Sequence, residues 1–308
     1  MLTRRTTLQA SLAGALAAST GALPVAAQDG PFRFGIIADP QYAPVPPNLA
    51  TKRYYANSLW KMQEAIADLN GHDLRFVATL GDIIDRHWES FGHILPLYDT
   101  LKHPKLFLLG NHDYEVGREF LRSVVRTVGM PNTYYDVPVG GWRFVVIDGN
   151  DVTTFAPPVG DPRRELAAER LAALKAAGAP NAQSWNGSLG DAQYAWLTET
   201  LERARAAREN VIVLSHYPVY PANIHNLWDS PKLVDLLTSY DNFVAFFCGH
   251  NHAGNYGEIG GRHFLNFRGM VDTPTTTAYS VVEIHPDRIE ILGRGREENR
   301  TLTIRARA

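Results

Sequence analysis

The sequence lacks three features that would assign it to a specialised class of protein. It has one cysteine in 308 residues, so no intramolecular disulfide can form and a packed core must stabilise the fold. It has no excess of charge of one sign, because 30 basic residues stand against 32 acidic ones, and nucleic acid is not an expected partner. Beyond the amino terminus it has no apolar run near the ~20 residues that span a bilayer, so we expect no membrane anchor in the mature protein.

The amino terminus has the pattern of an export signal. Arg4 and Arg5 precede an Ala/Leu-rich stretch that ends in small residues before Gln28. This pattern is typical of a twin-arginine signal peptide, which we expect to occupy residues 1–27. A membrane anchor is the alternative, but polar side chains interrupt the apolar run. If this segment is an export signal, the twin-arginine machinery is a partner of the chain, and we expect a periplasmic or secreted protein.

Residues 28–308 alternate short apolar runs with longer amphipathic ones. Strands are predicted at 32–39, 74–82 and 105–113, with helices at 54–70 and 93–101 between them. Residues 211–218, 230–240 and 243–252 repeat the strand, helix, strand order. Four further runs read as strands without helices between them: WRFVVIDG, HFLNFRGMV, AYSVVEIH and RIEILGRG. The pattern predicts an α/β fold with mixed sheets covered by helices.

An Ala-rich segment punctuated by proline lies around residues 151–186. Its run RRELAAERLAALKAAG predicts a helix, and we interpret the segment as an insertion in the single domain formed by residues 28–308. It is either a lid over a site or a surface helix with a solvated charged face.

Polar side chains able to bind a cation follow five of the predicted strands. In sheets flanked by helices, such residues collect beyond the carboxyl ends of the strands. A single aspartate there is ordinarily a turn former or helix cap, and a single histidine is ordinarily structural, so only the recurrence indicates a metal site. The candidates are Asp39 and Gln41 in ADPQY, Asp82 and Asp85 in GDIID, Asn111, His112 and Asp113 in GNHD, His216 in SHYP, and His250 and His252 in GHNH.

These motifs, in this order, resemble the calcineurin-like metallophosphoesterase superfamily, whose pattern is D-x-H, GDxxD, GNH[DE], a single His, and GHxH. The resemblance extends from Asp39 to His252, with one departure, because Gln41 stands where most members have histidine. The sequence Gln41-Tyr42 and the stretches RYYANSLWKMQEAIADLN, WNGSLGDAQYAWL and LGRGR are similar to the manganese-dependent ADP-ribose/CDP-alcohol diphosphatases. The resemblance implies an α/β/β/α sandwich of two mixed sheets flanked by helices.

The resemblance also implies a site for two divalent metal ions. The family pattern makes Asp82 a bridging ligand, gives one metal Asp39, Gln41 and His252, and gives the second Asn111, His216 and His250. Two such ions lie roughly 3.5–4 Å apart and hold a bridging hydroxide that attacks phosphorus. Because an amide oxygen replaces an imidazole at Gln41, Mn²⁺ is favoured, with Fe²⁺, Zn²⁺ or Co²⁺ as alternatives.

Further roles are expected beside the metals. By family analogy, His112 stabilises or protonates the leaving group, and either Asp85 or Asp113 orients the imidazole. Asp85 as a helix cap remains an alternative. The aromatic faces of Tyr42 and Tyr217 are candidates to bind the base of a nucleotide, and Arg86 is a candidate for its distal phosphate.

The expected activity is hydrolysis of the diphosphate bond of ADP-ribose, CDP-alcohols or related small molecules. The products would be a nucleoside monophosphate and a phosphorylated remainder. A broad phosphodiesterase or phosphomonoesterase, acting for example on cyclic nucleotides at the same two metals, is the alternative. A non-catalytic scaffold that retains the fold is a more remote one.

Overall fold

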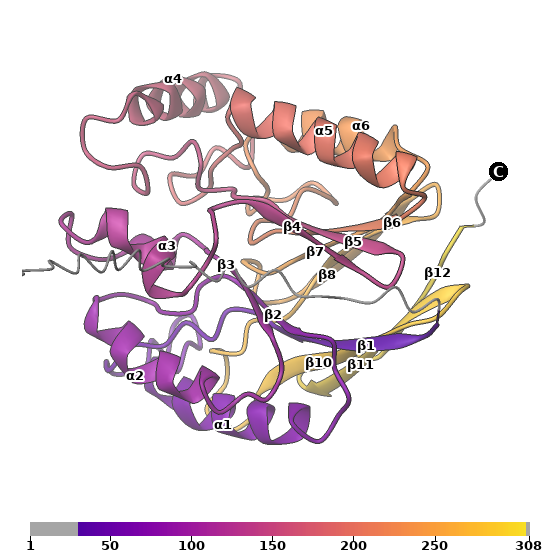
Figure 1. Cartoon of the computed structure of the whole chain (residues 1–308). Helices are drawn as coiled ribbons and strands as arrows, with labels where there is room; N and C mark the ends of the chain where they lie inside the picture. The colour runs from indigo at the N-terminus through magenta and orange to yellow at the C-terminus, as the bar shows by residue number, and fades with distance from the viewer. Residues whose placement is uncertain (1–29, 306–308) are drawn as a thin grey trace, which may run out of the picture.

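Two six-stranded sheets pack face to face in the computed structural model, which describes residues 30–305 (Figure 1). The first sheet has the order β12-β11-β10-β1-β2-β3 and the second β4-β5-β6-β7-β9-β8. The first comprises β1 (Phe32–Ile37), β2 (Val77–Leu80), β3 (Lys105–Leu108), β10 (Ala278–Ile284), β11 (Arg288–Gly295) and β12 (Arg300–Thr303). The second comprises β4 (Tyr135–Val139), β5 (Trp142–Val146), β6 (Asn210–Leu214), β7 (Phe243–Cys248), β8 (Asn255–Ile259) and β9 (Arg262–Asn266). The signal peptide predicted at 1–27 lies outside the described residues.

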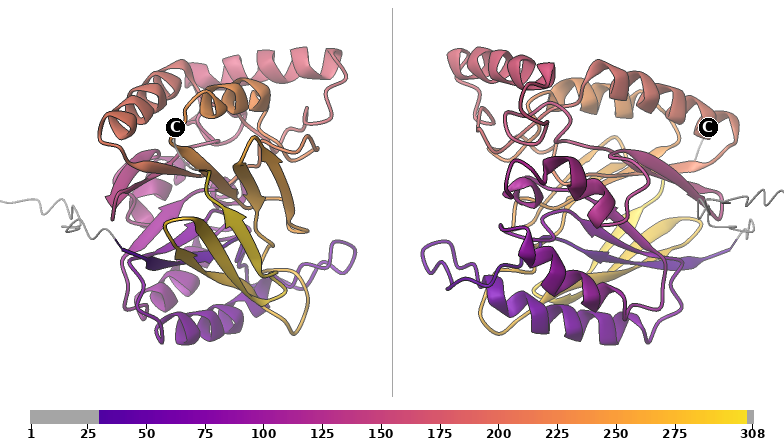
Figure 2. Two further views of the ribbon diagram at one scale, coloured as in Figure 1. Left: turned by 90° about the vertical axis from the view of Figure 1, so that its right-hand side faces the viewer. Right: turned by 60° about the vertical axis from the view of Figure 1, so that its left-hand side comes forward.

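Helices cover the outer face of each sheet (Figures 1 and 2). On the first sheet lie α1 (Ser58–Leu69), α2 (Glu89–Tyr98) and the short α3 (Val124–Thr127). On the second lie α4 (Pro162–Ala176), α5 (Asp191–Ala206) and α6 (Ser230–Thr238). Single 3₁₀ turns are formed by η1 (Tyr55–Asn57), η2 (His112–Tyr114) and η3 (Leu121–Ser123). The predicted sandwich of two mixed sheets flanked by helices is confirmed.

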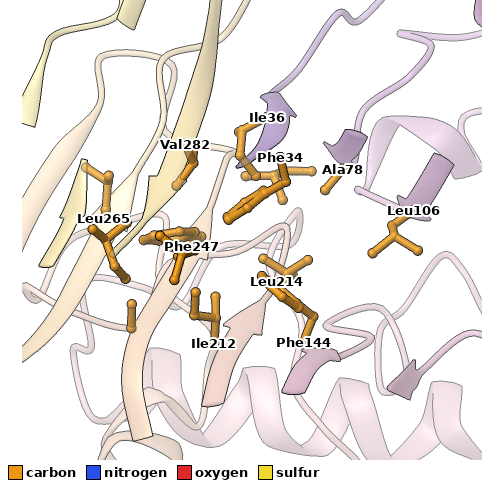
Figure 3. Packing of buried hydrophobic residues seen from close by; sticks show 14 of the residues in the cluster. Phe34, Ile36, Ala78, Leu106, Phe144, Ile212, Leu214, Phe247, Leu265 and Val282 are labelled. Carbon is orange, nitrogen blue, oxygen red and sulfur yellow. The ribbon is translucent and has the colours of Figure 1, made fainter. Parts of the chain in front are cut away.

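The main core fills the space between the two sheets (Figure 3). Phe34 of the first sheet packs edge-on against Phe144 of the second, with ring centroids 5.1 Å apart. Phe34 also stacks on Phe76 at 4.9 Å, and all three side chains are fully buried. Truncation of such buried aromatic residues typically costs about 3–5 kcal/mol, so this contact is a large part of what holds the sheets together.

Parallel strands bring the ends of distant segments to one edge of each sheet. In the first sheet β1, β2 and β3 are mutually parallel, and in the second β5, β6, β7 and β9 are. The loops that follow β1, β2, β3, β6 and β7 contain all five predicted motifs. The sandwich therefore gathers the motifs at the carboxyl ends of both sets of strands.

The predicted helix in segment 151–186 is α4, and side-chain contacts fasten it to the body. Arg164 donates hydrogen bonds to the main-chain oxygens of Thr154, Phe155 and Pro157 at 2.5–2.8 Å. Arg170 donates to the Leu189 oxygen at 2.8 Å. Because several hydrogen bonds hold α4 against the rest of the domain, the structure favours a packed surface helix over a lid.

Apart from the short α3 and the 3₁₀ turns η2 and η3, four elements were not predicted, and three of them are edge strands. β4, β8 and β12 lie at sheet edges, where one side is open and side chains are only partly buried, so no continuous apolar run marks them. The fourth is α5. Its buried face includes polar residues such as Gln193 and Thr200, so its sequence shows no clear apolar stripe. α2 begins at Glu89 rather than near His93. Among residues 30–305, no helix combines the length and apolar character needed to cross a membrane.

Candidate metal centre

The seven predicted metal ligands lie together at the seam between the two sheets. The loops after β1, β2 and β3 come from the first sheet, and those after β6 and β7 from the second. The side chains within 4.8 Å of one another form two groups that share one carboxylate: Asp39, Asp82 and His252, and Asp82, His216 and His250. Asn111 joins the second group through a contact described below, and Gln41 is tied to the shared residue by its backbone N–H, which donates to the main-chain oxygen of Asp82 at 2.7 Å. Asp82 thus occupies the position expected of a bridging ligand.

In the first group, His252 presents an unprotonated nitrogen to Asp39. The Nδ1 atom of His252 lies 2.9 Å from Oδ1 of Asp272, and because a carboxylate only accepts, Nδ1 carries the proton. The Nε2 lone pair then faces the Asp39 carboxylate, whose Oδ1 is 3.6 Å away. A carboxylate and a lone pair that face each other are an arrangement suited to a shared cation.

Gln41 leaves its carbonyl oxygen without a hydrogen-bond partner. Its Nε2 donates to Oδ1 of Asp85 at 3.0 Å, which fixes the orientation of the amide. The opposite atom, Oε1, is buried and has no partner among the described residues. Leaving a buried acceptor unpaired typically costs about 1–3 kcal/mol, and a hard divalent cation satisfies that acceptor.

In the second group, two imidazole lone pairs face each other. Nδ1 of His216 donates to the Leu80 oxygen at 2.8 Å, and Nε2 of His250 donates to Oδ1 of Asn186 at 3.0 Å. The remaining nitrogens, Nε2 of His216 and Nδ1 of His250, are 3.0 Å apart. Oδ1 of Asn111 lies 3.3 Å from the same Nε2 atom. Three acceptors therefore converge, which fits a metal ion.

The shared carboxylate belongs to Asp82. Its Oδ1 accepts the backbone N–H of His112 at 2.9 Å, while Oδ2 lies 3.4 Å from Nε2 of His216 and has no hydrogen-bond donor among residues 30–305. Burial opposes ionisation, but the positive charge that the rings of His216 and His112 carry when protonated outweighs it and holds the pKa of Asp82 well below its ordinary value. Burial raises the pKa of Asp39, and the adjacent Asp82 carboxylate adds to this. Two buried carboxylates this close are stabilised by cations between them.

The backbone at the ligands is held in an uncommon conformation. Positive φ is rare outside glycine and clusters at functional sites, where the surrounding structure enforces it. Four ligands have it: Asp39 at 47°, Gln41 at 45°, Asp82 at 48° and His250 at 70°. Holding these four residues at positive φ costs conformational free energy, and it fixes the direction in which their side chains point.

Glycine precedes several ligands because the space for a side chain is already filled. A Cβ at Gly110 would lie 2.1 Å from Oδ1 of Asp82, and one at Gly249 would lie 2.5 Å from Oδ2 of Asp39. Both distances are shorter than any non-bonded contact permits. The glycines of GNHD and GHNH thus allow the carboxylates of neighbouring loops to approach the backbone.

His112 is held by Asp85 rather than by Asp113. Its Nδ1 lies 3.1 Å from the main-chain oxygen and 3.3 Å from Oδ1 of Asp85, and the side chain is partly exposed. Nδ1 is thereby engaged, and Nε2 is the nitrogen left for a substrate. The same Asp85 accepts from Gln41 and from Nε of Arg86. Arg86 is about half exposed beside the site.

Asp113 fastens two ligand loops instead. Its oxygens accept the backbone N–H groups of Ile84 at 3.1 Å and Gly110 at 2.9 Å. Burial and, secondarily, the Asp82 carboxylate raise the pKa of Asp113 to about 8. Its contacts assign it to the support of the loops after β2 and β3, not to the orientation of His112.

The structure places Tyr42 and Tyr217 in the core, contrary to the expectation that they bind a base. Tyr42 is 4% exposed, and its hydroxyl lies 2.9 Å from Nδ1 of His93. Tyr217 is 0% exposed, donates to Oδ1 of Asn150 at 2.6 Å and packs edge-on against His216 and His250. Neither ring has an open face for stacking. Trp185, which stacks on His225 at 5.5 Å and lies 5.7 Å from His250, is more open.

Two residues that orient the ligands were missed in the sequence. Asn186 holds His250, and its own amide is fixed by donating to the oxygens of Asn181 and Ile224. Asp272 holds His252. Neither belongs to a metal-ligand motif. The only available signal was the general requirement that a ligating imidazole donate its second N–H to an acceptor.

Comparison with known proteins agrees with this geometry. The family described as calcineurin-like phosphoesterase matches residues 32–254. A manganese-dependent ADP-ribose/CDP-alcohol diphosphatase of Homo sapiens is 29% identical over 315 residues, covering 88% of this chain and 92% of the relative. One of Arabidopsis thaliana is 27% identical over 309 residues, covering 89% and 97%.

Solved structures share the fold. A dimetal phosphatase from Danio rerio superposes with a TM-score of 0.80 at 24% identity, covering 90% of this chain and all of that one. A structure described as GAP50, the anchor in the inner membrane complex of Plasmodium, superposes with a TM-score of 0.57 at 13% identity and covers 90% of each chain. Because the family match covers well over half of the sequence and includes five ligand motifs, the chain belongs to the calcineurin-like phosphoesterase family.

Proposed function

We propose that this chain hydrolyses the diphosphate bond of nucleoside diphosphate compounds such as ADP-ribose or CDP-alcohols, with Mn²⁺ as its metal. The observation that carries the proposal is the unpartnered, buried Oε1 of Gln41 among the carboxylate and imidazole donors. An oxygen in place of an imidazole at this position suits Mn²⁺. The names of the relatives that match most of the chain support the same substrate class.

Asp39, Gln41, His252 and the shared Asp82 would hold one cation, and Asn111, His216, His250 and Asp82 the other. When bound, such a pair polarises phosphoryl oxygens and makes water a nucleophile near neutral pH. The protein itself holds the metal ligands in place, because hydrogen bonds to other residues fix the orientation of the imidazoles and of the Gln41 amide. Preorganised donors of this kind need little rearrangement during the reaction.

His112 is suited to donate a proton from Nε2 to the departing phosphate oxygen. The Asp85 carboxylate, 3.3 Å from Nδ1, fixes the orientation of the ring so that Nε2 faces the site. Arg86, half exposed and bonded to the same carboxylate, is placed to neutralise a second phosphate. A diphosphate substrate presents such a second phosphate, whose charge a guanidinium can neutralise.

The fold alone does not distinguish a hydrolase from a scaffold, since a structure described as an anchor shares it. The distinction lies in the site. All seven ligand positions contain side chains able to bind a metal, and six of these side chains are oriented by a further hydrogen bond: Asp39, Gln41, Asp82, His216, His250 and His252. A scaffold needs none of this strained and preorganised geometry.

We also propose that the protein functions outside the cytoplasm, in the periplasm or as a secreted enzyme. The proposal rests on the sequence of residues 1–27, with its paired arginines and apolar stretch. The twin-arginine machinery would be the export partner.

The substrate proposal predicts Mn²⁺-dependent release of AMP from ADP-ribose and of CMP from CDP-choline. Metal-stripped protein is assayed on both compounds, on cyclic AMP and on p-nitrophenyl phosphate, with and without added Mn²⁺. Activity confined to the last two compounds would indicate the broad phosphodiesterase or phosphomonoesterase instead. No activity on any of the four would support the scaffold.

Replacement of the shared carboxylate, Asp82→Ala, should abolish tight binding of both Mn²⁺ ions and reduce turnover to the level without metal. Calorimetric titration with Mn²⁺ and the AMP-release assay measure the two effects. Asp73→Ala is the matched control, because Asp73 is exposed and lies before β2, at the opposite end from Asp82. Wild-type turnover in Asp82→Ala would rule out the two-metal site.

His112→Ala should lower kcat by about 10²–10⁴-fold, the usual effect of removing an acid or base. Bound Mn²⁺ should remain, because Asp82 contacts the backbone N–H of residue 112 and not its ring. The loss should be larger for an alkyl phosphodiester, whose alkoxide leaves poorly without a proton, than for a p-nitrophenyl ester, whose leaving group departs without one. Equal losses on both leaving groups would contradict proton donation by His112.

Export is tested by fractionating a bacterial host that has a twin-arginine system and expresses the full chain. The wild-type protein should be recovered from the periplasm or medium, and the paired variant Arg4→Lys/Arg5→Lys from the cytoplasm. An unchanged distribution in the variant would contradict the proposed route.

A further inference from the structure

Lys61 is a buried cation outside the set of metal ligands. It lies on α1, its side chain is 0% exposed, and its ammonium group contacts no carboxylate within salt-bridge distance among the described residues. Instead its three N–H groups face four consecutive main-chain oxygens, those of Met270 at 2.8 Å, Val271 at 3.2 Å, Asp272 at 2.8 Å and Thr273 at 2.7 Å, so that at least one hydrogen is shared between two oxygens. Burying an ammonium is costly unless its donors are satisfied, and here carbonyl dipoles replace water.

The four oxygens are all directed at one cation. Consecutive carbonyls ordinarily point away from one another, and segment 270–273 must curl to direct all of them at one point. Thr273, which is β-branched, has φ of 69° in the left-handed region, an outlier for this residue type. The positive charge offsets the mutual repulsion of the carbonyl dipoles and adds to the backbone hydrogen bonds of the segment, in which the N–H of Tyr54 donates to the Val271 oxygen at 3.0 Å and that of Thr273 to the Lys52 oxygen at 3.1 Å.

The same segment supports the first metal group on two sides. The N–H groups of Met270 and Val271 donate to the main-chain oxygens of Ala38 at 2.9 Å and Asp39 at 3.1 Å. The side chain of Asp272 accepts from Nδ1 of His252 at 2.9 Å and lies 3.3 Å from Nη1 of Arg296. Segment 270–273 thus connects the backbone at one ligand with the imidazole of another.

We propose that Lys61 is a positioning residue for the first metal: its ammonium acts as a built-in structural cation that shapes segment 270–273 so that Asp272 holds His252. The inference rests on the two-metal site of the proposed function but not on the identity of the substrate. In this proposal, one charge on α1 positions a metal ligand that it does not touch. It does so by binding the main-chain oxygens of the segment that contains Asp272.

The test is Lys61→Met, which keeps the length and apolar stem of the side chain and removes the charge and donors. Calorimetry and the electron paramagnetic resonance spectrum of Mn²⁺ measure the two binding steps separately. We expect one Mn²⁺ to bind about 10–100-fold more weakly, as is typical when support behind a ligand is lost, and the other to bind as in the wild type. Lys61→Gln, which keeps N–H donors without charge, serves as the second variant where methionine prevents folding.

Arg164→Met is the matched control. Arg164 also donates to three main-chain oxygens, but those of segment 154–157, which has no hydrogen bond to a ligand among the described contacts. It should lower the melting temperature without changing either Mn²⁺ affinity. If Lys61→Met behaves like this control, Lys61 only stabilises the fold and the inference is wrong.

A double-mutant cycle with Asp272→Asn tests the route. If Lys61 acts through Asp272, the two substitutions should have less than additive effects on Mn²⁺ affinity. Full additivity would exclude this route and overturn the inference. A wild-type protein that binds two Mn²⁺ ions but releases neither AMP nor CMP would disprove the proposed substrate alone, whereas one that binds no Mn²⁺ would disprove both proposals.

Discussion

Hydrogen bonds that cross from one sheet to the other hold the metal centre at the seam of the sandwich. The backbone N–H of His250, after β7, donates to both oxygens of Asp39, after β1, at 3.0 and 3.1 Å. In the opposite direction, His216, after β6, donates to the oxygen of Leu80 at the end of β2. Because neither sheet contains a complete group of ligands, the site exists only where the sheets are packed together. The aromatic core between them, with Phe34 against Phe144, is therefore also a requirement of the site.

Asp85 unites three functions that are often treated separately. One of its oxygens accepts from the amide of Gln41 and lies near the ring of His112, and the other accepts from Arg86. The orientation of a metal ligand, of the proposed acid and of the proposed phosphate-binding group thus depends on one buried carboxylate. A substitution at Asp85 would alter all three and could not be interpreted as the loss of a single role.

The sequence predicted mixed sheets with helices and the positions of the ligand loops because both leave local patterns, whereas the sandwich of two sheets was expected only from the family resemblance. Each ligand follows an apolar run, and three follow a glycine that close packing requires, as at Gly110 and Gly249. Support from distant segments leaves no such pattern. Asn186, Asp272 and Lys61 act only through contacts between segments remote in the chain, so their sequence neighbourhoods do not mark them. Tyr42 and Tyr217 were misjudged for the same reason, since a tyrosine beside a motif can face a ligand or the core.

The spacing of the ligands along the chain has a consequence for biosynthesis. Asp39 is made early, whereas His252 and the Asp272 that orients it are near the carboxyl end. During translation, the first ligands must wait for β7 and the segment after β9 before a complete coordination sphere can form. A complete set of ligands, with the residue that orients His252, is therefore available only late in the synthesis of the chain.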